Sequence, residues 1–198
     1  MRQDTFPPVV FALLMINAEV FVAEYYLGLR TPIVRHFALF SYGEAFAPWQ
    51  LLTYGFLHSN VMHLAFNMFG LWMFGRQLEL AWGAPRFLQY YLLCIVGAGI
   101  CQLIVSGFPD HFGYTVGASG AVYGILLAYG MTYPNRMIML IMPPIPIKAK
   151  YFVVMFGLLE LYSGLTRPGS SIAHFAHLGG MLIGLVLILY WRKRRYIR

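Results

Sequence analysis

The sequence predicts an all-α polytopic membrane protein, built as a single bundle of six transmembrane helices. Hydrophobic residues make up 60% of the chain and charged residues only 11%, whereas a soluble domain carries roughly a quarter charged residues. The mean hydropathy is +0.66. A membrane-spanning helix needs about 20 residues, and six apolar stretches reach or approach this length. They cover residues 7–29, 51–75, 85–106, 117–133, 151–165 and 172–191, within one domain expected to occupy residues 1–198.

The first apolar stretch is expected to remain as a helix in the mature protein. It contains Asn17, Glu19 and Glu24 and is too long for the hydrophobic region of a signal peptide. The connection that follows, residues 30–48, mixes apolar and aromatic side chains with few charges. We expect it to form a membrane-associated first outer loop that is partly embedded in the outer leaflet.

The third and fourth stretches carry two further structural signals. Cys94 and Cys101 are seven residues apart on one helix, too distant for a disulfide bond, so both are expected to serve in packing. The fourth stretch is short, which places Ser119 below the membrane surface. Residues 106–116 before it are rich in Gly, Pro and polar residues. Irregular backbone at membrane depth must be buried in protein or line a water-filled cavity, so we expect a wet pocket above Ser119.

The distribution of basic residues predicts that both termini are cytoplasmic. In that orientation eleven Lys and Arg residues lie on the inner side and three, Arg30, Arg35 and Arg167, on the outer side, as the positive-inside rule requires. The net charge of +7 does not indicate a nucleic-acid partner, because the basic residues are scattered at the ends of segments. The dense cluster within residues 192–198 is expected to be a basic cytoplasmic tail.

Two polar residues at membrane depth indicate a hydrolase. Ser119 begins the fourth stretch and His177 lies early in the sixth, 58 residues later, and both are next to small residues. Polar side chains inside a membrane are functional candidates. A serine that a histidine can deprotonate is the simplest nucleophilic hydrolase.

Small residues predict close contact between the fourth and sixth helices. Gly120 and Gly124 are four residues apart, as are Gly180 and Gly184. This spacing lets helix backbones approach closely, which is a structural role. Its consequence is functional, because the contact would bring the serine and the histidine within hydrogen-bond reach.

Other polar side chains share helical faces. His63 and Asn67 are four residues apart on the second stretch, so they project from one face. Such donors either bind an oxyanion, where each can lower the barrier of acyl transfer by ~3 kcal/mol, or form hydrogen bonds between helices. Tyr123 lies one turn after Ser119. Its ring either packs on an imidazole or is an ordinary aromatic of the bundle.

The expected site is a serine–histidine dyad without a metal. No acidic residue lies on the fourth or sixth stretch, and all lysines lie at inner-side ends, which disfavours lysine as the base. His58, five residues before His63, is expected to be a structural hydrogen bonder at the helix start. His174 and His177 share a face, but no third ligand at a suitable spacing is evident. A His-Glu-x-x-His motif is absent, which disfavours an intramembrane metalloprotease.

Together these motifs resemble the rhomboid family of intramembrane serine proteases. The motifs, in the order of that family, are His63-x-x-x-Asn67, Gly117-Ala-Ser119-Gly120 and Ala176-His177-x-x-Gly180-x-x-x-Gly184. The long first loop, residues 49–67 and Gly75-x-x-x-Glu79-x-x-x-Gly83 also resemble signatures of the family. The similarity covers essentially the whole chain. Each motif alone is weak, whereas the combination is specific.

The resemblance implies a six-helix rhomboid core with defined roles for the motif residues. Ser119 would be the nucleophile and His177 the general base. His63, Asn67 and the backbone N–H of Ser119 would form the oxyanion hole. Tyr123 would pack on the ring of the catalytic histidine.

The resemblance also assigns residues outside the dyad. Glu79 would brace the inner ends of helices, and Phe66 would lie at the boundary between the second and fifth helices, the substrate gate. One position departs from the family pattern: Trp49 is followed by Gln50, where the family often has an arginine. Gln50 cannot supply that charge, so the first loop lacks the charged anchor of the family.

The implied function is a serine-type endopeptidase that cleaves transmembrane protein substrates within or near the outer leaflet. Its substrates would unwind locally at helix-breaking residues, with a small side chain before the cut. Partners would be these substrates and the lipid bilayer, with no cofactor, no metal and no nucleic acid. By analogy, the compact core and the lack of a targeting segment indicate a multi-pass protein of a bacterial inner membrane.

Three other classes share part of the pattern. A non-catalytic rhomboid-like protein would bind transmembrane clients without cutting them, but both dyad positions are intact. A transporter or channel predicts an inverted repeat with broken helices, and none is visible in the sequence. An acyltransferase stays open on chemistry alone, because a serine dyad with an oxyanion hole serves either acceptor.

Overall fold

The computed structural model describes residues 7–41, 43, 45–105, 113–140, 144–166, 173–194 and 196–197. Some sequence predictions concern residues outside these ranges, namely Arg2, Arg167, Arg195, Arg198 and most of the stretch 106–116. The described residues are mostly helical, which confirms the helical class predicted from the sequence.

In the described part of the chain, most elements are helices, and two short antiparallel strand pairs lie between them. The helical elements are α1 (Pro8–Tyr25), α2 (Arg30–Phe37), α3 (Gln50–Thr53), η1 (Tyr54–Phe56), α4 (Val61–Gly70), η2 (Leu71–Gly75), α5 (Arg76–Trp82), α6 (Ala84–Val105), α7 (Ser119–Thr132), α8 (Ala149–Thr166) and α9 (His174–Lys193). Strand β1 (Leu39–Phe40) pairs with β2 (Tyr114–Thr115), and β3 (Met137–Met139) pairs with β4 (Pro146–Lys148). The β1–β2 pair ties the first loop to the segment that leads into α7.

Three helices of the described chain, α1, α6 and α9, are long and apolar enough to cross a membrane. Helix α7 has 14 residues, which at about 1.5 Å per residue extend only ~21 Å, short of the roughly 30 Å hydrocarbon core. Helix α8 has 18 residues. The predicted count of six spans is therefore supported by length and apolarity for three helices and stays a prediction for the rest.

The predicted second helix, 51–75, is wrong at both ends. The chain first forms α3 and η1 and leaves helical geometry before Asn60. Asn60 caps α4, because its side chain accepts a hydrogen bond from the backbone N–H of His63 at 2.9 Å. The helical path then continues through η2, a π-helical stretch, into α5 and ends at Gly83, whose φ is +85°. His58 therefore precedes the helix instead of lying on it.

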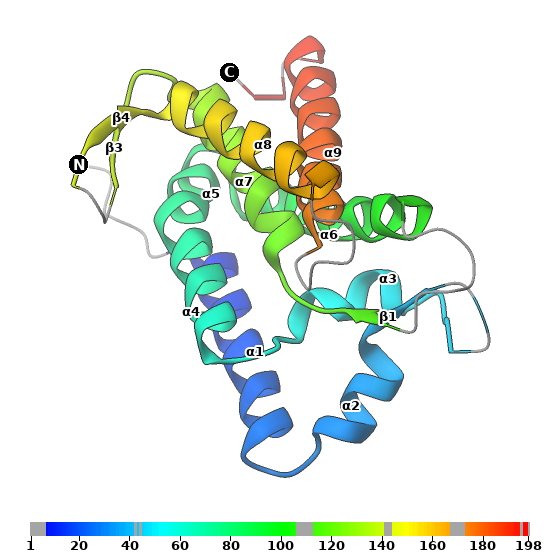
Figure 1. Cartoon of the computed structure of the whole chain (residues 1–198). Coiled ribbons are helices and arrows are strands. Elements are labelled where there is room, and N and C mark those ends of the chain that lie inside the picture. The colour runs from blue at the N-terminus through cyan, green and yellow to red at the C-terminus, as the bar shows by residue number, and fades with distance from the viewer. Residues whose placement is uncertain are drawn as a thin grey trace.

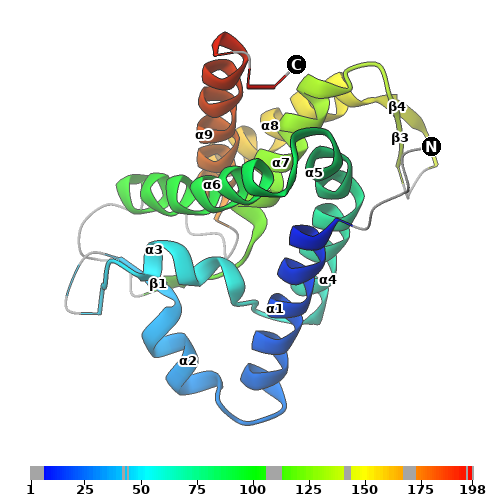
Figure 2. The same cartoon turned by 180° about the vertical axis from the view of Figure 1, so that it is seen from behind.

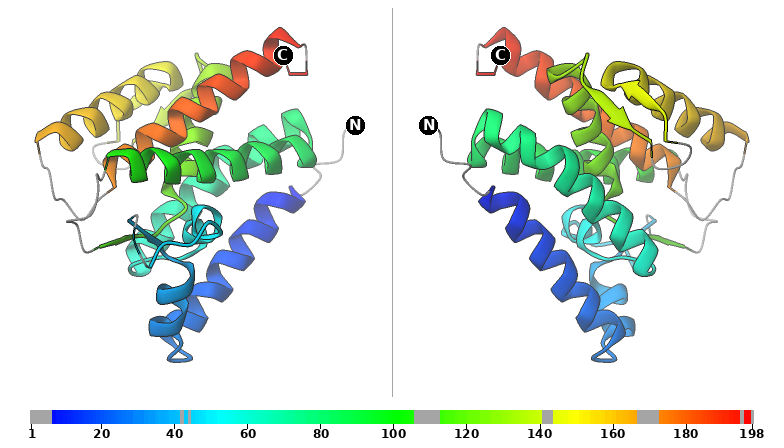
Figure 3. Two further views of the ribbon diagram at one scale, coloured as in Figure 1. Left: turned by 90° about the vertical axis from the view of Figure 1, so that its right-hand side faces the viewer. Right: turned by 90° about the vertical axis from the view of Figure 1, so that its left-hand side faces the viewer.

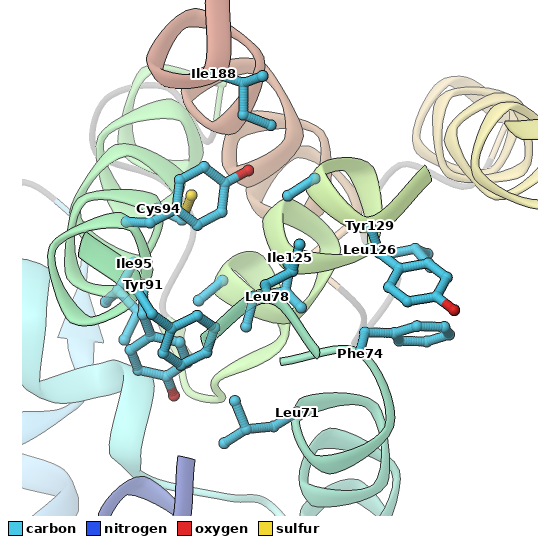
Figure 4. Close-up of a cluster of buried hydrophobic side chains, with 14 of the residues drawn as sticks. Leu71, Phe74, Leu78, Tyr91, Cys94, Ile95, Ile125, Leu126, Tyr129 and Ile188 are labelled. Carbon is cyan, nitrogen blue, oxygen red and sulfur yellow. The ribbon is translucent and has the colours of Figure 1, made fainter. Parts of the chain in front are cut away.

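Helices α6, α7 and α9 pack against one another at the centre of the molecule (Figure 1). Helix α1 lies beside α4 (Figure 2). Helix α8 packs against α7 and α9, on the side of this group away from α1 (Figure 3). The core holds large apolar side chains from several of these helices, including the tilted ring pair of Phe74 and Tyr129 (Figure 4).

Glycines at the crossing of α7 and α9 let the two backbones touch. A Cβ atom on Gly180 would lie 1.8 Å from the carbonyl oxygen of Gly120, closer than any side chain permits. A Cβ atom on Gly184 would lie 2.2 Å from the Tyr90 hydroxyl and 3.4 Å from the Cα atom of Gly124. The Tyr90 hydroxyl in turn donates to the carbonyl of Gly124 at 2.7 Å. The four glycines thus lie at the crossing of the helices that carry Ser119 and His177.

The buried carboxylate of Glu79 joins α5 to the start of α1. Its Oε1 and Oε2 atoms accept hydrogen bonds from the backbone N–H groups of Val9 at 2.9 Å and Val10 at 2.8 Å. The first turn of a helix has free N–H donors, and the end of the helix that carries them also favours a negative charge. Glu79 supplies both the acceptors and the charge from a distant part of the chain.

A neutral amide anchors the first loop. Gln50 is only 1% exposed. Its Oε1 atom accepts from the backbone N–H groups of Phe40 at 3.3 Å and Ala47 at 3.2 Å, and its Nε2 atom donates to the carbonyl of Ala45 at 3.0 Å. Three hydrogen bonds from a buried side chain fix the loop to α3. A neutral side chain therefore anchors the loop here, at the position where the family often has an arginine.

Candidate active site

Ser119 and His177 meet where α7 and α9 begin. The Nε2 atom of His177 lies 2.7 Å from the Oγ atom of Ser119. Ser119 is the first residue of α7, and His177 lies in the first turn of α9. His177 is only 7% exposed, so little water competes for its ring nitrogens. At this distance an unprotonated Nε2 can take the hydroxyl proton when the serine attacks an electrophile.

Tyr123 restrains the plane of the imidazole of His177. The two ring centroids are 4.4 Å apart and the ring planes differ by 7°, so the rings are stacked. Tyr123 lies one turn after Ser119 on α7, and one helix face therefore supplies both the hydroxyl and the stacking ring. Stacking opposes tilting of the imidazole out of its plane.

A carboxylate that no sequence motif indicates also faces His177. The Oε2 atom of Glu160, on α8, lies 3.0 Å from His177 Nδ1 and 2.6 Å from His174 Nδ1. The hydroxyl of Tyr123 donates to Oε1 of the same carboxylate. The expectation of a site without an acidic neighbour is therefore wrong. That expectation depends on acidic residues within the two helices of the dyad, whereas Glu160 lies on α8, which packs against both helices.

The sequence did contain a signal for this residue. Glu160 is the one acidic residue in the predicted stretch 151–165. A carboxylate at membrane depth is costly unless it has partners, and such residues are functional candidates. That argument identifies the residue but not the histidine it faces, because the register of α8 against α9 is not readable from apolar periodicity.

Glu160, His174 and His177 also form a group of three possible metal ligands, so the expectation that no third ligand accompanies the two histidines is wrong. The carboxylate oxygen lies at a hydrogen-bond distance of 2.6 Å from His174 Nδ1 and makes a close contact of 3.0 Å with His177 Nδ1. Two atoms bound to one tetrahedral zinc ion at about 2.0–2.1 Å would lie ~3.3 Å apart. Both separations are shorter than a shared zinc ion would set, and they fit a hydrogen bond with His174 and a close charge contact with His177.

His63, on α4, presents a ring N–H toward the turn that precedes α7. The backbone N–H of Ser59 points to His63 Nδ1 at 3.4 Å, and the Ser59 hydroxyl lies 3.0 Å from the same atom. A backbone N–H can only donate, so Nδ1 accepts and the proton of the neutral ring is on Nε2. Asn67 donates one amide hydrogen to the carbonyl of His63 at 2.9 Å and keeps a second for another acceptor. The buried ring of His58 stands edge-on to that of His63, with centroids 5.1 Å apart.

Gly117, in the turn before α7, lies directly against the ring of His63. Gly117 has a φ of +126°, a conformation that side chains rarely adopt. A Cβ atom there would lie 2.7 Å from His63 Nε2 and 3.7 Å from Ser119 Oγ. The proton-bearing nitrogen of His63 and the hydroxyl of Ser119 are therefore both close to Gly117.

Phe66 lies on the same helix as His63 and is 63% exposed. Its ring is accessible to a lipid chain or an approaching polypeptide. The gate role implied by the family resemblance stays a prediction.

The fold and the site define a class: a helical integral membrane protein with a serine–histidine pair at the crossing of two packed helices. Residues 45–194, about three-quarters of the chain, match the family model described as Rhomboid domain. The chain therefore belongs to the rhomboid family.

Several curated relatives agree with this membership. The chain is 27% identical over 186 residues to the mitochondrial Rhomboid protein 1 of Saccharomyces cerevisiae, covering 93% of this chain and 53% of the relative. It is 28% identical over 188 residues to Rhomboid protease GlpG of Photorhabdus laumondii, covering 94% and 62%. Identity to Rhomboid protease GlpG of Yersinia pestis is 31% over 151 residues, covering 76% and 50%. The chain thus spans between half and two-thirds of the length of these relatives.

Proposed function

We propose that this protein is a serine-type endopeptidase that cleaves transmembrane protein substrates inside the membrane. The observation that carries the proposal is the 2.7 Å separation of Ser119 Oγ and His177 Nε2 at a helix crossing. Two of the relatives are named as proteases, which favours peptide hydrolysis over acyl transfer to another acceptor. The chemistry needs neither a cofactor nor a metal.

The proposed reaction passes one proton between the two residues of the dyad. His177 Nε2 takes the hydroxyl proton while Ser119 Oγ attacks the carbonyl carbon of the scissile peptide bond. His177 then gives that proton to the leaving amine, and the C–N bond breaks to leave an acyl-enzyme. Water attacks the ester with His177 again as the base, which releases the new carboxyl group and restores the serine.

Three donors are proposed to stabilise the oxyanion of the tetrahedral intermediate. They are Nε2–H of His63, the side-chain amide of Asn67 and the backbone N–H of Ser119. The backbone N–H of Ser119 belongs to the first residue of α7, so it has no acceptor within the helix. The positive end of the α7 helix dipole lies at the same place and also favours the negative oxyanion. Each such donor is worth about 3 kcal/mol of barrier.

The same proposal places the catalytic site near the outer leaflet of a bacterial inner membrane. Six spans with both termini cytoplasmic would put the starts of α7 and α9 on the outer side, and residues 192–198 would be the basic inner tail. A substrate helix must unwind locally to expose a peptide bond, because helical hydrogen bonds shield it. Phe66 is proposed to lie where the substrate enters.

A covalent probe tests the activated serine directly. A fluorophosphonate should label purified wild-type protein in liposomes, and mass spectrometry of the digested protein should place the adduct on Ser119. Replacing His177 with alanine should remove the labelling, because a serine without a base is a poor nucleophile. Heat-denatured wild-type protein is the control for non-specific reaction.

Each outcome of the labelling experiment separates two functions. An adduct on Ser119 that depends on His177 supports the peptidase and justifies a search for substrates. Folded wild-type protein that stays unlabelled would contradict the proposal and favour a protein that binds transmembrane clients without cutting them.

Gly117→Ala should lower kcat/KM for a transmembrane substrate by about 100-fold, through the oxyanion site. The new methyl group would lie 2.7 Å from His63 Nε2, which displaces that ring, and it would also strain a backbone with φ of +126°. Cleavage in liposomes and thermal unfolding should be measured together. Gly113→Ala is the matched control, because a Cβ atom at Gly113 meets nothing within 4 Å. An unchanged rate in folded Gly117→Ala protein would contradict this placement of the oxyanion.

A further inference from the structure

We propose that Glu160 is a positioning residue for catalysis, which orients His177 from α8 and converts the serine–histidine dyad into a three-membered arrangement. The catalytic consequence of this inference rests on the proposed peptidase function. The orientation of the imidazole itself does not, and it can be observed separately.

The carboxylate and the serine contact opposite nitrogens of one ring. Ser119 Oγ lies 2.7 Å from Nε2 of His177, and Glu160 Oε2 lies 3.0 Å from Nδ1. An N–H on Nδ1 is not aimed straight at Oε2, and this nitrogen has no hydrogen-bond partner among the described residues. In this arrangement the contact is therefore a close electrostatic one. It strengthens when the ring takes the proton of the serine and becomes an imidazolium ion.

The carboxylate itself is held from two further directions. Its Oε1 atom accepts the hydroxyl of Tyr123, and Oε2 accepts Nδ1–H of His174 at 2.6 Å. Glu160 is only 9% exposed, so these donors replace the water that a carboxylate would otherwise need. An ionised carboxylate only accepts hydrogen bonds, and the Tyr123 hydroxyl and the His174 ring both offer hydrogens to it.

The position of the proton on His177 explains why a carboxylate matters there. A neutral imidazole carries one hydrogen, and Nε2 can accept the proton of Ser119 only if that hydrogen is on Nδ1. A negative charge beside Nδ1 favours this tautomer and stabilises the imidazolium ion that follows, which is the role of the acidic member of a serine triad. Tyr123 contacts both groups, because its ring stacks on the imidazole of His177 and its hydroxyl donates to the carboxylate of Glu160.

Two other roles for Glu160 make different predictions. A purely structural carboxylate would join α8 to α9, and its loss would lower stability and weaken substrate binding along with turnover. A ligand of a divalent ion, shared with His174 and His177, would make activity sensitive to chelators. A positioning residue instead changes turnover and the tautomer of one histidine, with the fold and the affinity for substrate retained.

Glu160→Gln is the test, because the amide keeps the shape of the side chain and removes its charge. We expect kcat for a transmembrane substrate in liposomes to fall about 100-fold, with KM within about threefold and the thermal transition within a few degrees. Glu19→Gln is the matched control, since it makes the same change at an exposed acid on α1. The control should match wild type in all three measurements.

The spectroscopic readout is nitrogen NMR of protein labelled with 15N-histidine, with His177→Ala used to assign the resonances. Wild-type His177 should show a protonated Nδ1 and an unprotonated Nε2 when neutral. In Glu160→Gln the 15N chemical shifts of Nδ1 and Nε2 should move toward each other, because the two tautomers are then mixed. Tyr123→Phe, which keeps the ring and removes one donor to the carboxylate, should produce a smaller change in the same direction.

Three results would overturn the inference. They are an unchanged kcat in Glu160→Gln, a fall in stability and a rise in KM that account for the loss, and loss of wild-type activity on addition of a chelator. Failure of the proposed function is separate: wild-type protein would then show neither labelling by the fluorophosphonate nor cleavage. The NMR comparison would still show whether Glu160 sets the tautomer of His177.

Discussion

Ser119→Ala should abolish cleavage of a transmembrane substrate while the protein stays folded. The hydroxyl is the proposed nucleophile, so its loss should reduce kcat on the order of 10⁴-fold or more, leaving only what the oxyanion site and binding supply. The structural cost is small, because one hydroxyl and its hydrogen bond to His177 are lost. A net hydrogen bond contributes about 1 kcal/mol. Cleavage in liposomes should be compared with the thermal transition of the same preparation.

Ser163→Ala is the matched control for this prediction. It removes a hydroxyl from α8, a helix of the same bundle, at a residue outside the proposed catalytic group. The variant should cleave at the wild-type rate. Persistent cleavage by Ser119→Ala would mean that another residue attacks the peptide bond. Unfolding of Ser119→Ala would show that the hydroxyl is needed for structure, so its loss of activity would no longer identify a nucleophile.

The serine and the histidine that the structure brings together could be singled out from the sequence, because each has a local signal. Both interrupt apolar stretches with a polar side chain beside small residues. Helical periodicity then relates His63 to Asn67 and Ser119 to Tyr123, since residues three or four apart share a face. The structure brings Ser119, Tyr123 and His177 together through one helix crossing.

The features that the sequence did not reveal depend on contacts between distant segments. Glu160 reaches the imidazole from a third helix, and the amide of Gln50 replaces an expected charge through hydrogen bonds to loop backbone. Apolar periodicity predicts too early a start for α4, because apolar residues continue through Tyr54 and Leu57. The start of α4 is instead set by the cap at Asn60, and a pattern of apolar residues carries no information about helix caps.

Gly180→Leu should disrupt both the fold and the activity, and it has the largest structural effect that we expect. Even the first carbon of a side chain at this position would lie 1.8 Å from the carbonyl oxygen of Gly120. The obstacle is backbone, so the strain can be relieved only by moving α9 away from α7. Overpacking of a core typically costs about 1–3 kcal/mol and occasionally more, and here two helices of the central group must separate. We expect loss of a cooperative thermal transition and no cleavage.

Two further variants show whether the crossing itself is responsible. Gly180→Ala should act in the same direction with a smaller loss of stability. Gly157→Ala is the control within a helix, because its Cβ atom would meet only the flexible end of Met181 at 3.3 Å. That control should retain its stability, since alanine favours helix by about 1 kcal/mol over glycine.

The activity of Gly180→Ala connects the packing to the chemistry. Ser119 and His177 are 2.7 Å apart where α7 and α9 touch, and a displacement of about 1 Å can lower a rate by 100-fold. Gly180→Ala should therefore lose fluorophosphonate labelling at temperatures where it is still folded. Wild-type labelling of a folded Gly180→Ala protein would contradict this, and would mean that the dyad is held by Tyr123 and Glu160 independently of the glycine contact.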